Sequence, residues 1–456
     1  QISATKPLVT ARDLSLAYSP GVAFPCLEIE KNPDAAYDYT AKGNMVAIIS
    51  NGTAVLGLGK LGALASKPVM EGKAVLFKRF ADIDGIDIEV DTGDVDEFVN
   101  CVKYLGKSWG GINLEDIAAP ACFMIEQQLS EKLDIPVFHD DQHGTAIVAA
   151  AGLLNALTIT GRDVKNFKMV VNGAGAAGIA CVELLKAMGM PSKNVIMCDR
   201  KGVISKSRND LDQWKSAHAV DTPHKTLEDA LKGADIAFGL SVKGAFTNDM
   251  MLSMNDKPII FAMANPDPEI TPDELRKIRP DAIIATGRSD YPNQVNNVLG
   301  FPYIFRGALD VRASAINIDM KVAATKALAD LAKQDVPDEV ANAYSGQHIK
   351  FGPEYIIPKP FDARLLTAIP PAVAKAAEES GVARKPIRDE LGYRRRLAAR
   401  LDKTATLIQS VADTVKASPK KIVFAEGEQE TVIRAAVQFY KEGYGTPILV
   451  GREEKV

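Results

Sequence analysis

Residues 169–178 read Met-Val-Val-Asn-Gly-Ala-Gly-Ala-Ala-Gly. The three glycines Gly173, Gly175 and Gly178 follow the G-x-G-x-x-G spacing, between an apolar strand-like run and a helical pattern. The first glycine permits a tight turn, the second lets a pyrophosphate approach the backbone, and the third permits close helix–strand packing. The N-terminus of the following helix then offers free amides to phosphate. The stretch predicts a dinucleotide-binding βαβ unit, although a glycine-rich turn without a ligand has the same composition.

The choice between NAD and NADP depends on the residues after the next apolar run, Val195–Cys198. Asp199 lies about 20 residues beyond the glycines, where an acidic residue binds the ribose 2′-hydroxyl of NAD. Arg200 and Lys201 follow at once and are suited to the 2′-phosphate of NADP. The basic pair could equally be a solvated strand end. The sequence therefore favours NADP only slightly over NAD.

Short apolar runs alternate with helical or turn segments on both sides of this loop. Downstream, the strand-like runs are Phe167–Asn172, Val195–Cys198, Ala234–Gly239 and Pro258–Met263, and residues 178–188 have a helical pattern. Upstream, Met45–Ile49 and Ala74–Phe77 are separated by glycine-rich turns. This alternation is typical of α/β proteins with parallel sheets. We expect one α/β domain over residues 1–160 and a Rossmann-type domain over residues 161–380.

Length and composition limit the class of protein. The 456 residues are enough for two or three domains, and 46% hydrophobic with 25% charged residues is an ordinary globular balance. A net charge of −4 argues against a nucleic-acid binder. The five cysteines are scattered and form no CxxC pair, so neither a disulfide framework nor a zinc ribbon is expected.

The N-terminus has no apolar signal region. The most apolar segment, Ala146–Leu157, is too short to span a membrane and predicts a core helix. We therefore expect a cytoplasmic protein.

A boundary near residue 381 marks the C-terminal part of the chain. Residues 381–456 hold 15 basic and 10 acidic residues, and they include the run Arg394-Arg395-Arg396, which could also be a solvated helix face. Lys421–Ala425, Gln429–Glu442 and Pro447–Val450 read as strand, helix and strand. A single βαβ unit cannot bury both faces of its sheet. We expect residues 381–456 to be a linker helix followed by the beginning of a third α/β domain, and we expect the chain to be cut inside that domain.

Two pairs of carboxylates, Glu115-Asp116 and Asp140-Asp141, each end a short apolar run. Neighbouring side chains on a strand point to opposite faces, so the backbone must turn if Glu115 and Asp116 share a ligand. Clustered carboxylates need a cation, and an all-oxygen set favours Mg²⁺ or Mn²⁺. The alternative is that each pair caps a helix.

Two histidines and one lysine in this region raise the possibility of zinc binding and of base catalysis. His139 and His143 invite a zinc hypothesis, but the HExxH pattern is absent and the Asp pair between them suits a loop better than a helix. Lys73 directly precedes the apolar run 74–77. A lysine withdrawn from water loses its charge more easily, particularly near a metal, and can then act as a base. The alternative is an exposed lysine at the start of a strand. Tyr18, in Tyr-Ser-Pro-Gly-Val, would by itself be a packing or turn residue.

Taken together, these segments resemble the malic enzymes from about residue 14 to residue 318. The similar segments, in order along the chain, are Tyr18-Ser-Pro-Gly-Val, Val55-Leu-Gly-Leu-Gly, Glu71-Gly-Lys73, Asn113-Leu-Glu115-Asp116, Phe138-His-Asp140-Asp141, the glycine loop 172–178, Ala264-Asn265-Pro266 and Gln294-Val-Asn296-Asn297. The resemblance implies oxidative decarboxylation of malate to pyruvate and carbon dioxide with reduction of NADP or NAD, and a homodimer or larger homo-oligomer.

The resemblance also implies roles for individual residues. Glu115, Asp116 and Asp141 would hold Mg²⁺ or Mn²⁺. Lys73, oriented by Asp140, would be the general base, and Tyr18 would protonate the enolate. The cofactor would be bound by Gly173, Gly175, Ala176, Ala177, Gly178, Asp199, Arg200, Lys201 and Asn265. Asn265 and Asn297 would hydrogen-bond the malate carboxylates.

One position departs from the family pattern. Larger malic enzymes carry an arginine just before the Leu-Gly-Leu-Gly turn, where this chain has Ala54. A bidentate clamp for a substrate carboxylate is therefore missing there. Lys78, Arg288 or the two asparagines are candidates to replace it.

The segment from Lys421 to Gly451 resembles the opening of a phosphotransacetylase domain. Bacterial hybrid malic enzymes join the two parts in this order, and the resemblance implies an acyl-CoA effector. Two other functions remain open. One is a 2-hydroxy-acid dehydrogenase that does not decarboxylate, and the other is a non-catalytic regulatory or assembly module.

Overall fold

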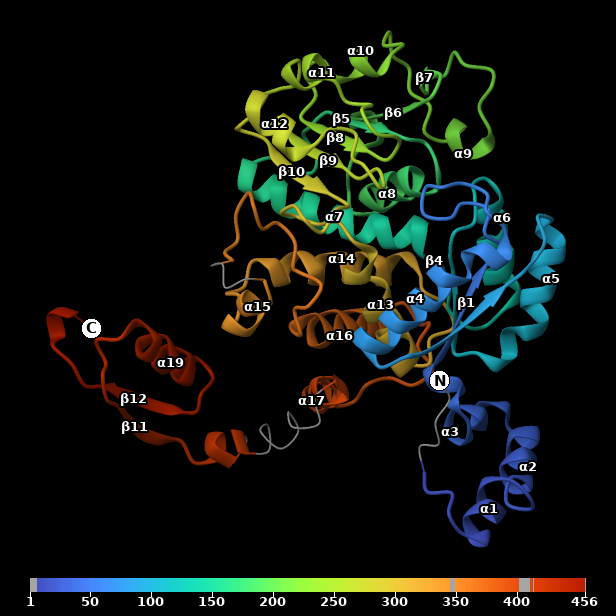
Figure 1. The fold of residues 1–456 in the computed structure, drawn as a ribbon, viewed down its shortest axis with the longest axis vertical. Coiled ribbons are helices and arrows are strands. Elements are labelled where there is room, and N and C mark those ends of the chain that lie inside the picture. The colour runs from blue at the N-terminus through green and yellow to red at the C-terminus, as the bar shows by residue number, and fades with distance from the viewer. Residues whose placement is uncertain (1–5, 345–348, 402–410, 413, 456) are drawn as a thin grey trace. The chain divides into compact units, whose positions relative to one another are not determined.

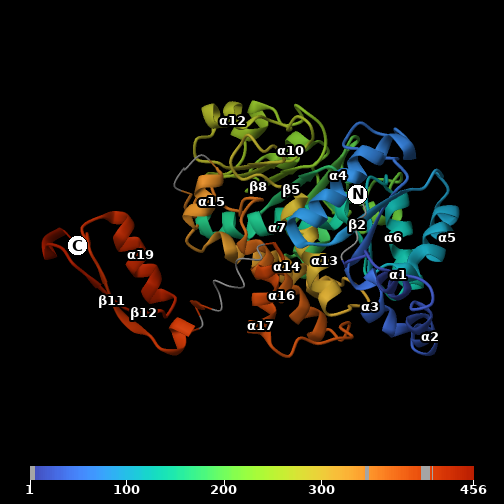
Figure 2. The same cartoon turned by 60° about the horizontal axis from the view of Figure 1, so that its bottom comes forward.

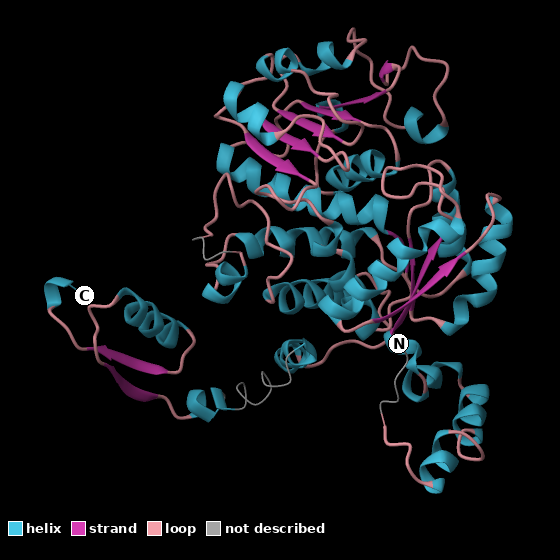
Figure 3. Ribbon diagram, viewed as in Figure 1, coloured by secondary structure: helices cyan, strands magenta, loops and turns pink. Residues whose placement is uncertain are grey.

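The computed structural model describes residues 6–344, 349–401, 411–412 and 414–455. The chain divides into two compact units, residues 1–387 and residues 388–456. The larger unit is an α/β structure built on two sheets, as predicted (Figures 1 and 3). The domain boundaries near residues 160 and 381 stay predictions.

The first sheet is parallel and has the order β2-β1-β3-β4. Its strands are β1 (Met45–Ser50), β2 (Asp84–Glu89), β3 (Gly111–Leu114) and β4 (Val137–His139). Helices α4 (Ala63–Ala81), α5 (Val95–Leu105) and α6 (Ala121–Lys132) alternate with these strands. All four residues of β3 and all three of β4 are buried, as is usual for parallel strands covered on both faces. Because β3 and β4 are parallel neighbours, their carboxyl ends lie at the same edge of the sheet, and Glu115 and Asp140 follow them there.

The second sheet has the order β10-β9-β8-β5-β6-β7 and is parallel except for β7. Its strands are β5 (Met169–Asn172), β6 (Val195–Asp199), β7 (Gly202–Val203), β8 (Ile236–Gly239), β9 (Ile259–Ala262) and β10 (Ile283–Thr286). The four strands predicted here are confirmed as β5, β6, β8 and β9. Helix α8 (Ala176–Ala187) follows the glycine loop, as expected.

Helix α7 (Asp140–Thr160) connects the two sheets and packs against α8 and α14 (Ile318–Ala332). Figures 1 and 2 show α7 running beneath the second sheet, with α14 alongside. Among the described residues it is the one helix long and apolar enough to cross a membrane, and 67% of that window is buried inside the protein. The core helix expected at Ala146–Leu157 is thus confirmed.

The remaining described α-helices of the larger unit are shorter or lie at its ends. They are α1 (Ala11–Ala17), α2 (Ala23–Lys31), α3 (Ala36–Tyr39), α9 (Gln213–Ser216), α10 (Leu227–Leu231), α11 (Asn248–Leu252), α12 (Pro272–Ile278), α13 (Phe301–Asp310), α15 (Asp338–Ala343) and α16 (Arg364–Glu379). Helices α1 to α3 contain no buried residue.

The smaller unit contains α17 (Glu390–Leu401), β11 (Lys420–Phe424), α19 (Glu430–Lys441) and β12 (Gly445–Leu449). The two strands pair in parallel, Lys420 opposite Gly445, which confirms the predicted βαβ arrangement. Four of the five residues of β11 are exposed, in keeping with a pair of strands too small to bury its own faces.

Two local expectations are wrong. The run 74–77 is not a strand start but the middle of α4, whose buried residues Met70, Lys73, Phe77 and Ala81 recur at helical spacing. A four-residue apolar run cannot distinguish strand from helix, and the longer period decides. Asp140 and Asp141 form the first turn of α7 rather than a loop, where acidic side chains are favoured by the helix dipole.

Candidate functional site

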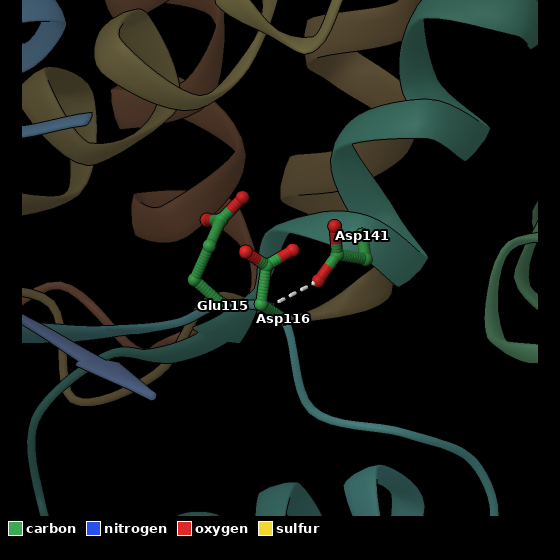
Figure 4. A group of neighbouring side chains, drawn as sticks. All are labelled: Glu115, Asp116 and Asp141. Atoms are coloured by element: carbon green, nitrogen blue, oxygen red, sulfur yellow. Dashed lines mark hydrogen bonds between the residues drawn. The ribbon is translucent and has the colours of Figure 1, made fainter. Parts of the chain in front are cut away.

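Three carboxylates meet at the carboxyl edge of the first sheet. Figure 4 shows Glu115 and Asp116, which follow β3, beside Asp141 from the first turn of α7. One oxygen from each lies within 4.8 Å of the other two. Asp116 has φ 53°, which is the turn needed for adjacent side chains to share a ligand. Its backbone N–H donates to Asp141 Oδ2 at 2.8 Å and fixes the two segments together.

The charges of this cluster are poorly compensated by the protein alone. Burial raises the pKa of Glu115 well above its usual value. Lys73 acts against this shift, and the nearby aspartates add to it. Burial and the charge of Asp141 raise the pKa of Asp116 to about 7. Asp116 Oδ2 is buried and has no hydrogen-bond partner within the described part of the chain. An all-oxygen cluster with an unsatisfied acceptor fits a divalent ion such as Mg²⁺ or Mn²⁺.

Lys73 reaches the same cluster from α4 and is only 9% exposed. Its Nζ donates to Asp140 Oδ2 at 2.7 Å and lies 2.9 Å from Glu115 Oε1. Burial lowers the pKa of Lys73, but the two carboxylates outweigh burial and raise it above its ordinary value. The sequence-based expectation that Lys73 loses its charge easily did not include these two carboxylates, which favour the protonated amine when no cation neutralises them. The role of Lys73 as a base therefore stays a prediction that depends on a bound divalent ion.

Asn297 lies beside this lysine–aspartate pair, and Asn265 belongs to a neighbouring loop. Asn297 Nδ2 donates to Asp140 Oδ2 at 3.1 Å, while its Oδ1 accepts from Thr145 at 3.1 Å. Asn265 is exposed, and its carbonyl oxygen lies close to Gly57 in the glycine-rich turn 52–62. The structure thus brings Asn297 into the cluster and leaves Asn265 at its border.

Tyr18 is not brought into the cluster. It follows α1 as the C-cap residue and is 71% exposed. Within the described ranges, the structure shows no contact between its side chain and the carboxylates or Lys73. Its role as an acid therefore stays a prediction from the family resemblance.

The glycine loop has the geometry that its spacing predicts. Gly173 has φ 129°, and a Cβ on Gly178 would overlap the Gly173 carbonyl oxygen, so both positions need glycine. A Cβ on Gly175 would meet nothing within 4 Å, which leaves space for a pyrophosphate. Ala176 and Ala177 begin α8 directly after this space.

The end of β6 carries a cluster of basic side chains, of which the sequence motif contains only Arg200 and Lys201. Asp199 accepts from Arg208 at 2.8 and 3.1 Å and from Lys215 Nζ at 3.2 Å. These bonds lower the pKa of Asp199 although burial alone would raise it. Lys201 pairs with Asp210 at 2.7 Å, and Arg200 is exposed. Arg208 and Lys215 were missed because they come from later segments that fold back onto β6.

Ala54, which stands where larger malic enzymes have an arginine, contacts the backbone of the carboxylate cluster. The Ala54 N–H donates to the Asp116 carbonyl oxygen at 3.0 Å. Of the candidate replacements for the missing arginine, Lys78 is bound to Asp82 and Asp84 at 2.7 and 3.0 Å. Arg288 pairs with Asp290, and it follows Gly287, which lies against the Asn265 side chain.

The larger unit thus joins a dinucleotide-binding type of sheet, through α7, to a cluster of carboxylates and a buried lysine, an arrangement within the class of α/β proteins with a nucleotide-binding fold. Comparison with family models narrows the class. Residues 1–130 match "Malic enzyme, N-terminal domain", residues 142–344 match "Malic enzyme, NAD binding domain", and residues 406–456 match "Phosphate acetyl/butaryl transferase". The chain belongs to the malic enzyme family, and its C-terminal part matches the second family that its sequence resembles.

Known relatives and solved structures agree with this assignment. The chain is 68% identical over 455 residues to the NADP-dependent malic enzyme of Rhizobium meliloti, and it spans 60% of that protein's length. It is 60% identical to the NADP-dependent malic enzyme of Halomonas elongata, with 84% of this chain and 91% of that protein covered. The crystal structure of malic enzyme from Pyrococcus horikoshii superimposes with a TM-score of 0.81 at 39% identity, covering 91% of this chain and 94% of the other.

Proposed function

We propose that this chain oxidises (S)-malate with NADP⁺ and decarboxylates the product to pyruvate and carbon dioxide, in a reaction that needs Mg²⁺ or Mn²⁺. The observation that carries the proposal is the meeting of Glu115, Asp116 and Asp141 with the Lys73–Asp140 pair. The names of the Rhizobium and Halomonas relatives support the same activity. NAD⁺ is the alternative cofactor.

Each step of the proposed reaction is assigned to residues of this site. Glu115, Asp116 and Asp141 would hold the divalent ion, which supplies Lewis-acid stabilisation of charge on the substrate oxygens. Lys73 would accept the proton of the C2 hydroxyl group while hydride leaves for the nicotinamide. Asp140 holds Nζ in place and stabilises the positive charge that the proton brings. Tyr18 would protonate C3 after carbon dioxide departs, and Asn265 and Asn297 would bind the malate carboxylates.

The proposal predicts a metal requirement with a definite dependence on pH. Chelation with EDTA should abolish malate-dependent NADPH formation, and added Mn²⁺ should restore it. Because the pKa of Asp116 is raised to about 7, protons compete with the metal below that pH. The Mn²⁺ concentration for half-maximal rate should rise by about tenfold or more per pH unit below 7, because Glu115, whose pKa is raised as well, must also lose its proton to bind the metal. A rate that survives chelation, or a Mn²⁺ requirement that does not change between pH 6 and 8, would contradict the proposed site.

The preference for NADP over NAD is supported by the partners of Asp199. Both carboxylate oxygens already accept from Arg208, and one also accepts from Lys215, so the ribose 2′-hydroxyl of NAD would have to displace one of these cations. The same cations, with Arg200 and Lys201, would attract a 2′-phosphate.

Replacing Arg208 with serine should therefore raise the Kd for NADP⁺ about tenfold or more, which corresponds to the loss of one charge-assisted contact. The Kd for NAD⁺ should change by less than threefold. Fluorescence titration with both cofactors measures this, with the exposed Arg276→Ser in α12 as the control. An equal loss of affinity for both cofactors would show that Arg208 supports the loop and does not select the phosphate.

Four further proposals concern assembly, regulation, domain boundaries and location. Exposed apolar side chains on the N-terminal helices, among them Leu14, Leu16 and Phe24, support assembly into a homodimer or larger oligomer. The match of residues 406–456 to phosphate acetyl/butaryl transferases supports an acyl-CoA effector. We also propose domains over residues 1–160, 161–380 and 381–456, and a cytoplasmic location.

A further inference from the structure

A further acidic side chain, Glu126, binds the residues on either side of Asp140 and Asp141 and has no role in the proposed chemistry. It projects from α6, and its side chain is 15% exposed. Its carboxylate accepts from the backbone N–H of His139 at 3.1 Å and from Gln142 Nε2 at 3.2 Å. It also lies 2.9 Å from His143 Nε2. These three partners flank Asp140 and Asp141 on both sides.

The first turn of α7 needs such a partner. The N-terminal N–H groups of a helix lack acceptors within the helix, and the N-cap residue His139 makes no side-chain capping bond. A carboxylate at this end also compensates the helix dipole. Burial alone would raise the pKa of Glu126, but His143, Lys321 and His139 outweigh it and lower the pKa to about 2. Glu126 is therefore a negative charge at neutral pH.

The His139 ring does not provide the same support. It is completely buried, and both of its ring nitrogens lack a hydrogen-bond partner within the described ranges. Its Nδ1 is 3.9 Å from Asp141 Oδ2, which is too long for a hydrogen bond. The position of Asp141 is thus set by the Asp116 N–H and by the backbone of the turn that Glu126 binds.

We propose that Glu126 is a positioning residue that fixes the first turn of α7 and thereby sets the affinity of the Glu115–Asp116–Asp141 cluster for its divalent ion. This inference rests on the metal site of the proposed function. Partners outside the ligand shell that hold metal ligands in place typically change affinity by about 10- to 100-fold when they are removed. A shift of the turn would move Asp141 away from Glu115 and Asp116, which belong to a different segment.

The test is direct Mn²⁺ binding to the purified chain, followed by the electron paramagnetic resonance signal of free Mn²⁺ without substrate. Glu126→Gln keeps the size of the side chain and one acceptor oxygen but removes the charge. We expect its Kd for Mn²⁺ to rise about tenfold, while the Kd for NADP⁺ stays within twofold of wild type. Glu131→Gln, an exposed position on the same helix, should leave both constants unchanged.

Enzyme kinetics separate positioning from a general structural effect. In Glu126→Gln the half-saturating Mn²⁺ concentration should rise while kcat at saturating Mn²⁺ falls by less than threefold. Glu126→Asp retains the charge but has a shorter reach, so we expect an intermediate Mn²⁺ affinity, and this variant serves if Glu126→Gln does not fold. A Mn²⁺ Kd within twofold of wild type in both variants, or an equal loss of NADP⁺ affinity, would overturn the proposal. Failure of the wild-type chain to bind Mn²⁺ would instead overturn the metal site itself.

Discussion

Replacing Lys73 with alanine is expected to lower kcat for malate oxidation by about 10³- to 10⁴-fold, the upper part of the range for a lost general base. Lys73 is the buried amine whose Nζ lies within 3 Å of both Asp140 and Glu115, so the variant loses the proposed proton acceptor and leaves two carboxylates without their cation. Stopped-flow measurement of NADPH formation at saturating malate and Mn²⁺ gives the rate.

Lys67 provides a matched control for this experiment. It lies on the same helix and pairs with the half-buried Asp87 and Glu89, but its own side chain is 41% exposed and it makes no ion pair with the carboxylate cluster in the described residues. Lys67→Ala should keep kcat within about twofold, because it removes no group of the proposed proton transfer or metal site. A Lys73→Ala enzyme that retained a tenth or more of the wild-type kcat would show that another group removes the proton.

Replacing Asp141 with asparagine is expected to raise the Kd for Mn²⁺ about 100-fold or more. The variant keeps the shape of the side chain but removes one of three anionic ligands, and direct ligands contribute at least as much as the outer partners whose loss costs up to about 100-fold. Isothermal titration with Mn²⁺ measures the affinity, and cofactor reduction at high Mn²⁺ should recover part of the activity. The Kd for NADP⁺ should be unchanged, since Asp141 belongs to the first turn of α7, whereas the glycine loop proposed to bind the pyrophosphate lies between β5 and α8.

Asp134→Asn is the control for this variant because Asp134 is an exposed carboxylate outside the cluster. Mn²⁺ affinity in the control should equal that of the wild type. If Asp141→Asn also bound Mn²⁺ as tightly as wild type, the ion would have to be held by other residues.

Local patterns predicted most of the second sheet. The strand before the glycines, the helix after them and the strand ending at Asp199 all depend on short-range signals, and the structure places β5, α8 and β6 there. That the pairs Glu115-Asp116 and Asp140-Asp141 lie near each other follows from strand ends that share one edge of a parallel sheet, whereas the choice of Glu115, Asp116 and Asp141 as the ligand set came from the resemblance to malic enzymes. The turn at Asp116 that this required is present.

Other features depend on contacts between distant segments. The helix that carries Lys73 was missed because four apolar residues fit a strand as well as a helix. The raised pKa of Lys73 depends on Asp140, which is 67 positions away in the chain. Arg208 and Glu126 belong to no motif, and they gain their roles only when later or neighbouring segments fold against Asp199 and the start of α7.

Product analysis decides whether the chain both oxidises and decarboxylates malate. The purified chain would be incubated with L-malate, Mn²⁺ and NADP⁺, with NAD⁺ in parallel, and NADPH, pyruvate, carbon dioxide and oxaloacetate would be measured. We expect reduced cofactor, pyruvate and carbon dioxide to form in equal amounts, and faster with NADP⁺ than with NAD⁺. Reduced cofactor with oxaloacetate and no pyruvate would identify a simple 2-hydroxy-acid dehydrogenase instead. No reduction of either cofactor would overturn the proposed activity and favour a non-catalytic module.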